Sequence, residues 1–189
     1  MNAHTRLTFF EEYWQRAYFS DDCIYCLRVM TMQQSTWKPY AAWIGGTEAV
    51  GALAGLLTRD GTKLYAATVA KPPLSPPPIV FPIAWAGLYA LMGTGAARVY
   101  LTPASVFRRR GLRLYLIQLG FNFFWSLIFF NLRAYGAAFV WLAALWALIL
   151  MMTAVFRRAD RLAGLLQIPY VLWVLFAGYL NFGVWLLNG

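Results

Sequence analysis

The stretch that decides the fold is AYGAAFVWLAALWALILMMTAVF, residues 134–156, which contains no charged side chain. About 20 consecutive apolar residues in a helix cross the core of a lipid bilayer. Further apolar stretches occur at residues 40–57, 79–101, 112–130 and 162–187. The backbone of a membrane span must satisfy its hydrogen bonds internally, and the alternating pattern of a barrel is absent. The sequence therefore predicts an all-α polytopic membrane protein, a bundle of five transmembrane helices.

The composition favours the same interpretation. Hydrophobic residues make up 61% of the chain, charged residues make up 12%, and the mean hydropathy is +0.55. Because a soluble domain carries about 25% charged residues, much of this surface is expected to face lipid. The stretch at residues 40–57 is the weakest of the five, since it is rich in glycine and contains Glu48.

The net charge of +9 is concentrated in short arginine clusters between the apolar stretches. Nucleic-acid binding would favour basic residues spread over one folded face, so no nucleic-acid partner is expected. If the first span enters from the cytoplasm, that side holds eight basic residues: Lys38, Arg108, Arg109, Arg110, Arg113, Arg157, Arg158 and Arg161. The far side holds four: Arg59, Lys63, Lys71 and Arg133. This bias predicts a cytoplasmic N-terminus.

Conventional catalytic and metal-binding sets are missing from the apolar part of the sequence. Asp160 is the only acidic residue from residue 79 onward, and His4 is the only histidine. Cys23 and Cys26 form a single CxxC, whereas a zinc site needs about four ligands. We therefore expect no metal, no cofactor and no carboxylate pair for acid–base chemistry.

Residues 1–36 differ in composition from residues 37–189, which we assign to the membrane domain. The first segment contains four of the seven acidic residues, so it does not resemble a signal peptide. Phe10, Tyr13, Trp14 and Tyr18 recur at helical spacing, which predicts an interfacial amphipathic helix. The alternative is a miscalled start, with the true chain beginning at Met30 or Met32.

Residues 71–78, KPPLSPPP, cannot form a helix, because successive prolines remove amide donors and hold the chain extended. We call this segment the strap. It predicts a stiff connection between the first two spans. The strap either only connects these helices or also covers the bundle as a lid.

Three groups of residues carry a resemblance to a known family. In the strap and the second span they are Lys71, Pro72, Pro76, Pro77, Val80, Phe81, Pro82, Trp85, Leu88 and Tyr89. In the third span they are Gln118, Asn122, Trp125, Phe129 and Phe130. In the last span they are Ala163, Leu166, Pro169, Tyr170, Trp173, Ala177, Leu180, Asn181, Trp185 and Asn188. In this order, from about residue 40 to the C-terminus, they resemble the translocator protein (TspO/MBR) family.

The resemblance implies a five-helix bundle, usually dimeric, with a pocket beneath the first loop. The family binds porphyrins, and many members bind sterols and benzodiazepine-type drugs. Bacterial members are connected with tetrapyrrole sensing, export and light-dependent breakdown. For this chain the resemblance implies a homodimer, a bacterial cell membrane, and a porphyrin or related tetrapyrrole as partner, with lipid as a further one. Gly51 and Gly55 form a GxxxG pair that suits close helix contact in a dimer.

Two departures from the family pattern bear on the ligand. Tyr65, Ala66, Leu74 and Ile79 stand where the family's first loop has Trp, Tyr, Trp and Trp, so the strap offers less aromatic surface. The family's cholesterol-recognition pattern needs a basic residue after an aromatic one, and residues 182–188 contain none. A sterol partner is therefore disfavoured.

The resemblance and the helical spacing together nominate a ligand site. Its expected residues are Phe81, Trp85, Tyr89, Gln118, Asn122, Trp125, Tyr170, Trp173, Ala177 and Asn181. Unpaired amides are costly in a membrane, so they are expected to face the bundle. The alternative is that the amides only bond neighbouring helices. Trp185 is interpreted as an interfacial belt residue, and Trp141 and Trp146 as lipid-facing or core residues.

Three functions remain open from the sequence. The leading hypothesis is a membrane receptor or carrier that binds protoporphyrin-type tetrapyrroles or other flat apolar ligands inside the bundle. The second is a light- and oxygen-dependent enzyme that degrades porphyrin, with Trp85 and Trp173 as its redox-active catalytic residues. The third is a transporter-accessory subunit whose cavity is filled with lipid.

Overall fold

The computed structural model describes residues 37–189. The helix and the alternative start predicted within residues 1–36 lie outside the described residues. Residues 39–189 form one unit of closely packed helices.

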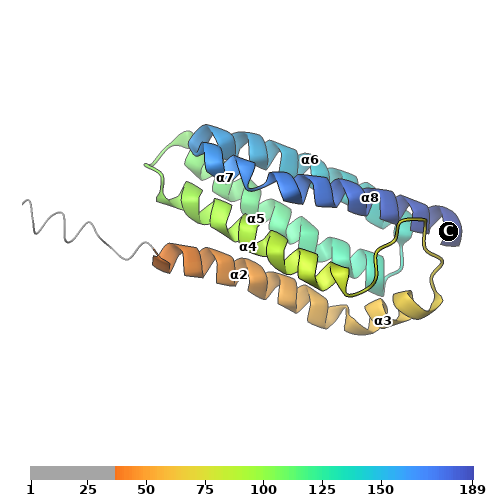
Figure 1. The fold of residues 1–189 in the computed structure, drawn as a ribbon. Helices are drawn as coiled ribbons and strands as arrows, with labels where there is room; N and C mark the ends of the chain where they lie inside the picture. The colour runs from red at the N-terminus through yellow and green to blue at the C-terminus, as the bar shows by residue number, and fades with distance from the viewer. Residues whose placement is uncertain (1–36) are drawn as a thin grey trace, which may run out of the picture. The chain divides into compact units, whose positions relative to one another are not determined.

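The chain folds into helices joined by short connections (Figure 1). They are α2 (Trp37–Leu57), α3 (Arg59–Thr68), α4 (Val80–Leu101), α5 (Val106–Ser126), the π-helical turn η1 (Leu127–Asn131), α6 (Tyr135–Ala159), α7 (Arg161–Leu165) and α8 (Ile168–Asn188). Four segments are long and apolar enough to cross a membrane: α4, α5 with η1, α6, and α7 with α8. The pair α2 and α3, bent by 59°, is the fifth candidate. The predicted all-α membrane bundle is confirmed.

The core of the bundle draws on α4, α5, α6 and α8, and α6 packs against α5, α7 and α8. Its fully buried side chains include Leu145, Ile149, Met152 and Phe156. Large apolar side chains also cover the outside, where Val140 is 68% exposed and Leu172 is 60% exposed. A soluble protein rarely exposes so continuous an apolar surface, whereas lipid solvates it.

Two helix ends differ from the sequence prediction. The first span does not stop at Leu57, because the chain continues after a bend as α3. At the bend, the Thr58 hydroxyl donates to the Ala54 carbonyl over 2.8 Å. The third span starts at Val106 rather than at residue 112, because Ser105 caps it by accepting a hydrogen bond from the Arg108 amide (3.1 Å).

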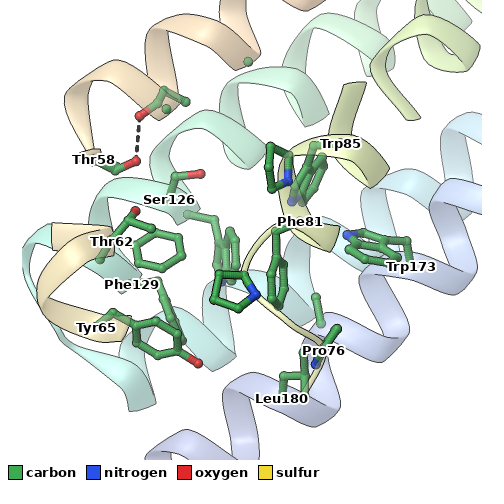
Figure 2. Close-up of a pocket in the computed structure, with 18 of the residues that line it drawn as sticks. Thr58, Thr62, Tyr65, Pro76, Phe81, Trp85, Ser126, Phe129, Trp173 and Leu180 are labelled. Carbon is green, nitrogen blue, oxygen red and sulfur yellow. Dashed lines mark hydrogen bonds between the residues drawn. The ribbon is translucent and has the colours of Figure 1, made fainter. Parts of the chain in front are cut away.

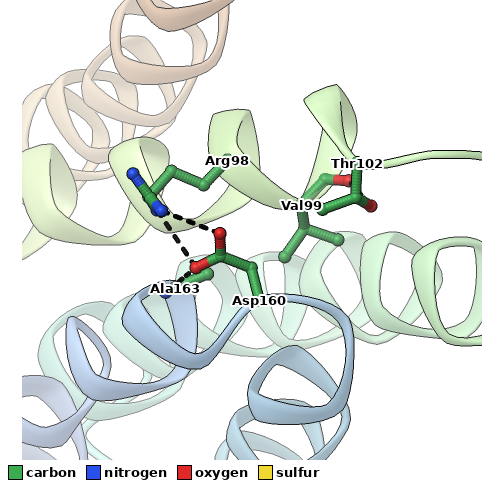
Figure 3. A network of polar contacts seen from close by, with 5 residues as sticks. All are labelled: Arg98, Val99, Thr102, Asp160 and Ala163. Atoms are coloured by element: carbon green, nitrogen blue, oxygen red, sulfur yellow. Dashed lines mark hydrogen bonds and ion pairs between the residues drawn. The ribbon is translucent and has the colours of Figure 1, made fainter.

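The last predicted span is broken into α7 and α8, with Pro169 in the first turn of α8. Asp160 fixes the start of α7 (Figure 3). Its Oδ1 accepts from the Ala163 amide (2.7 Å) and from Arg98 Nε (3.1 Å), and its Oδ2 accepts from Arg98 Nη2 (2.8 Å). The end of α4 is thereby held beside the connection between α6 and α7.

The strap contains no helix, as predicted. It leaves α3, passes the C-terminal end of α8 and returns to α4 (yellow in Figure 1). Asn188 accepts from the Ala70 amide (3.0 Å) and donates to the Ala70 carbonyl (2.9 Å). Tyr179 donates to the Pro73 carbonyl (3.0 Å). The strap is therefore fastened to α8 at Pro73 and, through Ala70, at its N-terminal end.

The two tryptophans of α6 pack against the core, which is one of the two alternatives left open by the sequence. Trp141 Nε1 donates to the Phe121 carbonyl over 2.8 Å, and the two rings stack with centroids 4.5 Å apart. Trp146 Nε1 donates to the Val171 carbonyl (3.1 Å). These bonds fasten α6 to α5 and to α8.

Candidate ligand-binding cavity

A cavity of about 520 Å³ lies between α2, α3, the strap, α4, the end of α5 with η1, and α8 (Figure 2). Its volume falls within the range of small-molecule sites. The wall is mainly aromatic and aliphatic, with a few hydroxyl and amide groups. The cavity lies beneath the strap, which contributes Lys71, Ser75, Pro76 and Pro78 to the lining.

Seven of the ten residues nominated from the sequence line this cavity. They are Phe81, Trp85, Tyr89, Trp125, Trp173, Ala177 and Asn181. The α4 residues recur every four positions and therefore share one face of the helix. The small Ala177 side chain leaves space between Trp173 and Asn181 along α8.

The lining aromatic rings are held by one another. The Phe81 and Trp173 rings meet edge to face with centroids 6.1 Å apart, across α4 and α8. The centroids of the Trp85 and Tyr89 rings lie 5.2 Å apart. On the opposite side, Trp125 stacks on Phe129 at 5.2 Å. Such pairs prefer offset or edge-to-face geometry, so these contacts fix the orientation of the rings that a ligand would meet.

The other three nominated residues, Gln118, Asn122 and Tyr170, are buried behind the wall and do not line the cavity. They form a chain of hydrogen bonds that begins at Tyr89. Tyr89 Oη donates to Asn122 Oδ1 (3.0 Å). Asn122 Nδ2 donates to the Tyr170 hydroxyl (2.8 Å), which donates to Gln118 Oε1 (2.9 Å). These residues join α4, α5 and α8 behind the wall. Contact of Gln118, Asn122 and Tyr170 with a ligand stays a prediction.

Asn181 combines the two roles, because it lines the cavity and also bonds its neighbours. Its Oδ1 accepts from Trp125 Nε1 (3.2 Å), and its Nδ2 donates to the Tyr135 carbonyl (2.8 Å). The Trp125 ring is therefore fixed by a hydrogen bond as well as by stacking.

Sequence reasoning missed the side of the cavity built by α2, α3 and η1. Thr58, Thr62 and Tyr65 recur at helical spacing along this side (Figure 2). The Tyr65 ring lies 5.4 Å from Phe129 and 5.5 Å from Phe130. The helical spacing of these three residues could have indicated this side of the cavity. It was not used because the predicted helix ended at residue 57.

The two glycines of the GxxxG pair both line the cavity. A Cβ atom built on Gly51 would collide with the Tyr89 ring, so this glycine permits close approach of α2 and α4 within one chain. A Cβ on Gly55 would meet open space. Gly51 therefore serves a contact within one chain, and the homodimer stays a prediction.

Two ionisable side chains, Glu48 and Lys71, also belong to the wall. Lys71 Nζ donates to the Ala66 carbonyl (2.9 Å) and lies 5.5 Å from the centroid of the Tyr65 ring. A cation above an aromatic ring is attracted to its face. The ammonium group is therefore held at the strap side of the cavity.

These features define an integral membrane protein with an aromatic cavity, the architecture of a membrane binding or sensory protein. Residues 43–186 match the TspO/MBR family, to which this chain belongs. It is 40% identical over 119 residues to protein CrtK of Rhodobacter capsulatus, covering 62% of this chain and 74% of that protein. It is 37% identical over 149 residues to the tryptophan-rich protein TspO of Chlorobaculum tepidum, covering 78% and 94%. It is 33% identical over 128 residues to the human translocator protein, covering 67% and 75%.

Proposed function

We propose that this protein binds flat, largely apolar ring systems of the tetrapyrrole type, such as protoporphyrin, in the cavity beneath the strap. The observation that carries the proposal is the enclosure of the cavity by aromatic faces from three helices: Phe81 and Trp85 of α4, Trp125 of α5 and Trp173 of α8. Stacking on such faces contributes roughly 0.5–1.5 kcal/mol per pair beyond the burial of area. The protein would act as a receptor or carrier of its ligand.

The proposal includes a bacterial cell membrane, a cytoplasmic N-terminus and a homodimer. Both large arginine clusters support the orientation, because they flank the α4–α5 and α6–α7 connections. The ion pair between Arg98 and Asp160 holds these connections at the same end of the helices. Positive charge at one end is the expected mark of the cytoplasmic side.

A second function, light- and oxygen-dependent degradation of porphyrin, is favoured by the position of two tryptophans. Trp85 and Trp173 both line the cavity, so a bound ring would contact two oxidisable indoles. The third hypothesis, a lipid-filled accessory subunit, would leave this aromatic surface without a specific ligand.

The test is a titration of detergent-purified protein with protoporphyrin, followed by absorption in the dark and under illumination. Saturable binding without loss of the porphyrin band supports a receptor or carrier. Loss of the band in light with a new product supports the enzyme. Absence of any spectral change in the porphyrin would contradict both.

A pair of variants assigns the signal to the cavity. Ala177→Phe fills part of it and is expected to weaken porphyrin binding at least tenfold, which corresponds to about 1.4 kcal/mol. Ala144→Phe adds the same side chain on the exposed side of α6 and is expected to bind like the wild type. Equal affinities of the two variants would show that the ligand binds elsewhere.

A further inference from the structure

Glu48 is an acidic residue on a membrane-spanning helix pair, and its side chain belongs to the wall of the cavity. It is only partly buried. Within residues 37–189 the ion pairs are Arg59–Asp60, Lys63–Asp60 and Arg98–Asp160, and none involves Glu48. An ionisable group in a membrane segment is costly without a partner and commonly marks a functional site.

The position of Glu48 along the cavity is defined by its neighbours on α2. The lining residues of this helix are Glu48, Gly51, Ala52, Ala54, Gly55 and, at its end, Thr58. Apart from Glu48 and Thr58 they are glycine or alanine. At a rise of 1.5 Å per residue, Glu48 lies about 15 Å from Thr58 along the helix. Glu48 is therefore at the inner end, away from α3 and the strap. Between Glu48 and Thr58, the Tyr89 ring packs on Gly51, whereas Gly55 meets open space.

The groups around the inner end do not satisfy the carboxyl group. Tyr89 packs against Gly51, one turn from Glu48, but its hydroxyl donates to Asn122. The one cation among the described lining residues is Lys71, at the strap side of the cavity. Its ammonium group already bonds the Ala66 carbonyl. The two ends of the cavity therefore differ in charge. The Glu48 carboxyl group offers a hydrogen-bond acceptor at the inner end, and the Lys71 ammonium group offers a cation at the outer end.

We propose that Glu48 is a specificity-determining residue of this cavity. Its carboxylate accepts a hydrogen bond from an N–H group of the bound ring system, or forms an ion pair with a positively charged nitrogen of that ring system. The cavity therefore selects nitrogen-bearing flat rings over hydrocarbons of the same shape. This inference rests on the proposed function and narrows its ligand class.

The physical basis is the difference between two bound states. A hydrocarbon ring that fills the cavity removes water from the carboxyl group and gives no hydrogen bond in return, which is costly. A ring with a suitably placed N–H or cationic nitrogen replaces that water with a charge-assisted hydrogen bond. Discrimination arises because the site rejects a ligand that leaves its polar group unpaired.

The experiment compares two flat three-ring probes of nearly equal shape. One is 9-aminoacridine, which is a cation at neutral pH, and the other is the neutral 9-methylanthracene. Each probe is titrated into the full chain in a neutral detergent, in competition with protoporphyrin and with tryptophan fluorescence as a second readout. The chain is compared with Glu48→Gln, which keeps the side-chain shape, and with Asp60→Asn. Asp60 is an exposed acid on α3 that does not line the cavity, so its variant controls for the loss of one negative charge.

We expect the wild type to prefer 9-aminoacridine. Glu48→Gln should lower the affinity for this cation about tenfold and change the affinity for 9-methylanthracene less than about twofold. Asp60→Asn should change neither. Unchanged affinity of Glu48→Gln for 9-aminoacridine overturns the inference. An equal fall in the affinities for both probes also overturns it, because a residue that sets specificity should leave the affinity for the neutral ring nearly unchanged. If the wild type binds neither the probes nor protoporphyrin, the proposed function itself fails.

Discussion

Five tryptophan side chains of the bundle fall into two groups according to the hydrogen bonds of their indole N–H groups. Trp125, Trp141 and Trp146 each donate to an oxygen of a neighbouring helix. Trp85 and Trp173 line the cavity, and neither donates a hydrogen bond to a residue that the structure describes. The first group positions helices. The second group presents a ring face and a free donor to whatever enters the cavity.

This division leads to a prediction for Trp85→Phe and Trp173→Phe. Each variant keeps an aromatic face, so the affinity for protoporphyrin should fall by about 1 kcal/mol or less per site. If these indoles are electron donors, the same changes should abolish light-dependent loss of the porphyrin band, because phenylalanine is far harder to oxidise. The measurement is the rate of band loss at saturating porphyrin under fixed light. Equal rates in the wild type and the double variant would remove the redox role and leave the binding role.

The limit of sequence reasoning at this scale is visible in α4, α5 and α8. Spacing correctly placed Tyr89, Asn122 and Tyr170 on faces directed into the bundle. It could not distinguish a residue that touches the cavity from one that forms the hydrogen-bonded layer behind it, because both layers face inward. Only the packing of α2 against Tyr89 decides where the open space lies.

Lys71 allows a test at the outer end of the cavity. Its ammonium group lines the wall beside Tyr65, at a position where a carboxylate on the edge of a ring ligand would gain an ion pair. Lys71→Met should therefore weaken the binding of protoporphyrin roughly twofold to fivefold and leave its dimethyl ester unchanged, since an exposed ion pair contributes up to about 1 kcal/mol. Titration of both ligands by absorption checks this prediction. Equal weakening for the acid and the ester would indicate that Lys71 acts by shaping the strap.

Among the elements, α3 and η1 were the hardest to predict. A helix of mixed polarity after a bend lacks a continuous apolar pattern, so the stretch predicted from the sequence ended at residue 57. In the structure α3 packs against η1, and the Asn131 side chain donates to the Leu57 carbonyl (3.0 Å) at the end of α2. Extra turns of π-helix are frequent at functional sites. Here η1 brings Phe129 and Phe130 to the cavity wall.

The strap gives a prediction at the scale of an element. Asn188→Ala removes both hydrogen bonds to Ala70 while Tyr179 still holds Pro73. Each hydrogen bond contributes about 1 kcal/mol, so the loosened strap should release a bound ligand several times faster. Stopped-flow dissociation of protoporphyrin measures this rate. Asn131→Ala, which loosens η1 instead, serves as the matched amide control. An unchanged release rate in Asn188→Ala would mean that the strap is only a connector.

The connection between α6 and α7 predicts a dependence of stability on pH. The hydrogen bond from Arg98 holds the pKa of the Asp160 carboxyl below its ordinary value. A lowered pKa in the folded state means that this carboxylate stabilises the fold above its ordinary pKa, and that the contribution is lost as the pH falls through the folded value. Asp160→Asn keeps a capping side chain and removes the charge. It should lower the thermal midpoint at neutral pH and reduce the difference between neutral and acidic pH, measured by thermal unfolding in detergent. An identical pH profile in this variant and the wild type would contradict the assignment.

For the molecule as a whole, the apolar stretches alone were enough to predict a membrane bundle, because a stretch of about 20 apolar residues has the length and composition of a membrane-spanning helix. All five stretches became helices, and the first of them, predicted at residues 40–57, is α2 at Trp37–Leu57. It is also the stretch in which glycine and Glu48 weakened the apolar signal. Glu48, Gly51 and Gly55 line the cavity, so the residues that weakened the apolar signal belong to the site.

The last prediction concerns the part of the chain that the cavity requires. Every lining residue lies between Glu48 and Asn181, and the match to the TspO/MBR family begins at residue 43. A chain that starts at residue 37 should therefore fold, elute as a single species in mild detergent and bind protoporphyrin within about twofold of the full chain. Size-exclusion chromatography and the absorption titration provide the two measurements, and Ala177→Phe in the shortened chain is the control that the signal still comes from the cavity. Aggregation of the shortened chain, or a large loss of affinity without aggregation, would show that residues 1–36 contribute to the membrane domain. Retained binding would instead restrict any role of those residues to processes outside the cavity, such as membrane attachment.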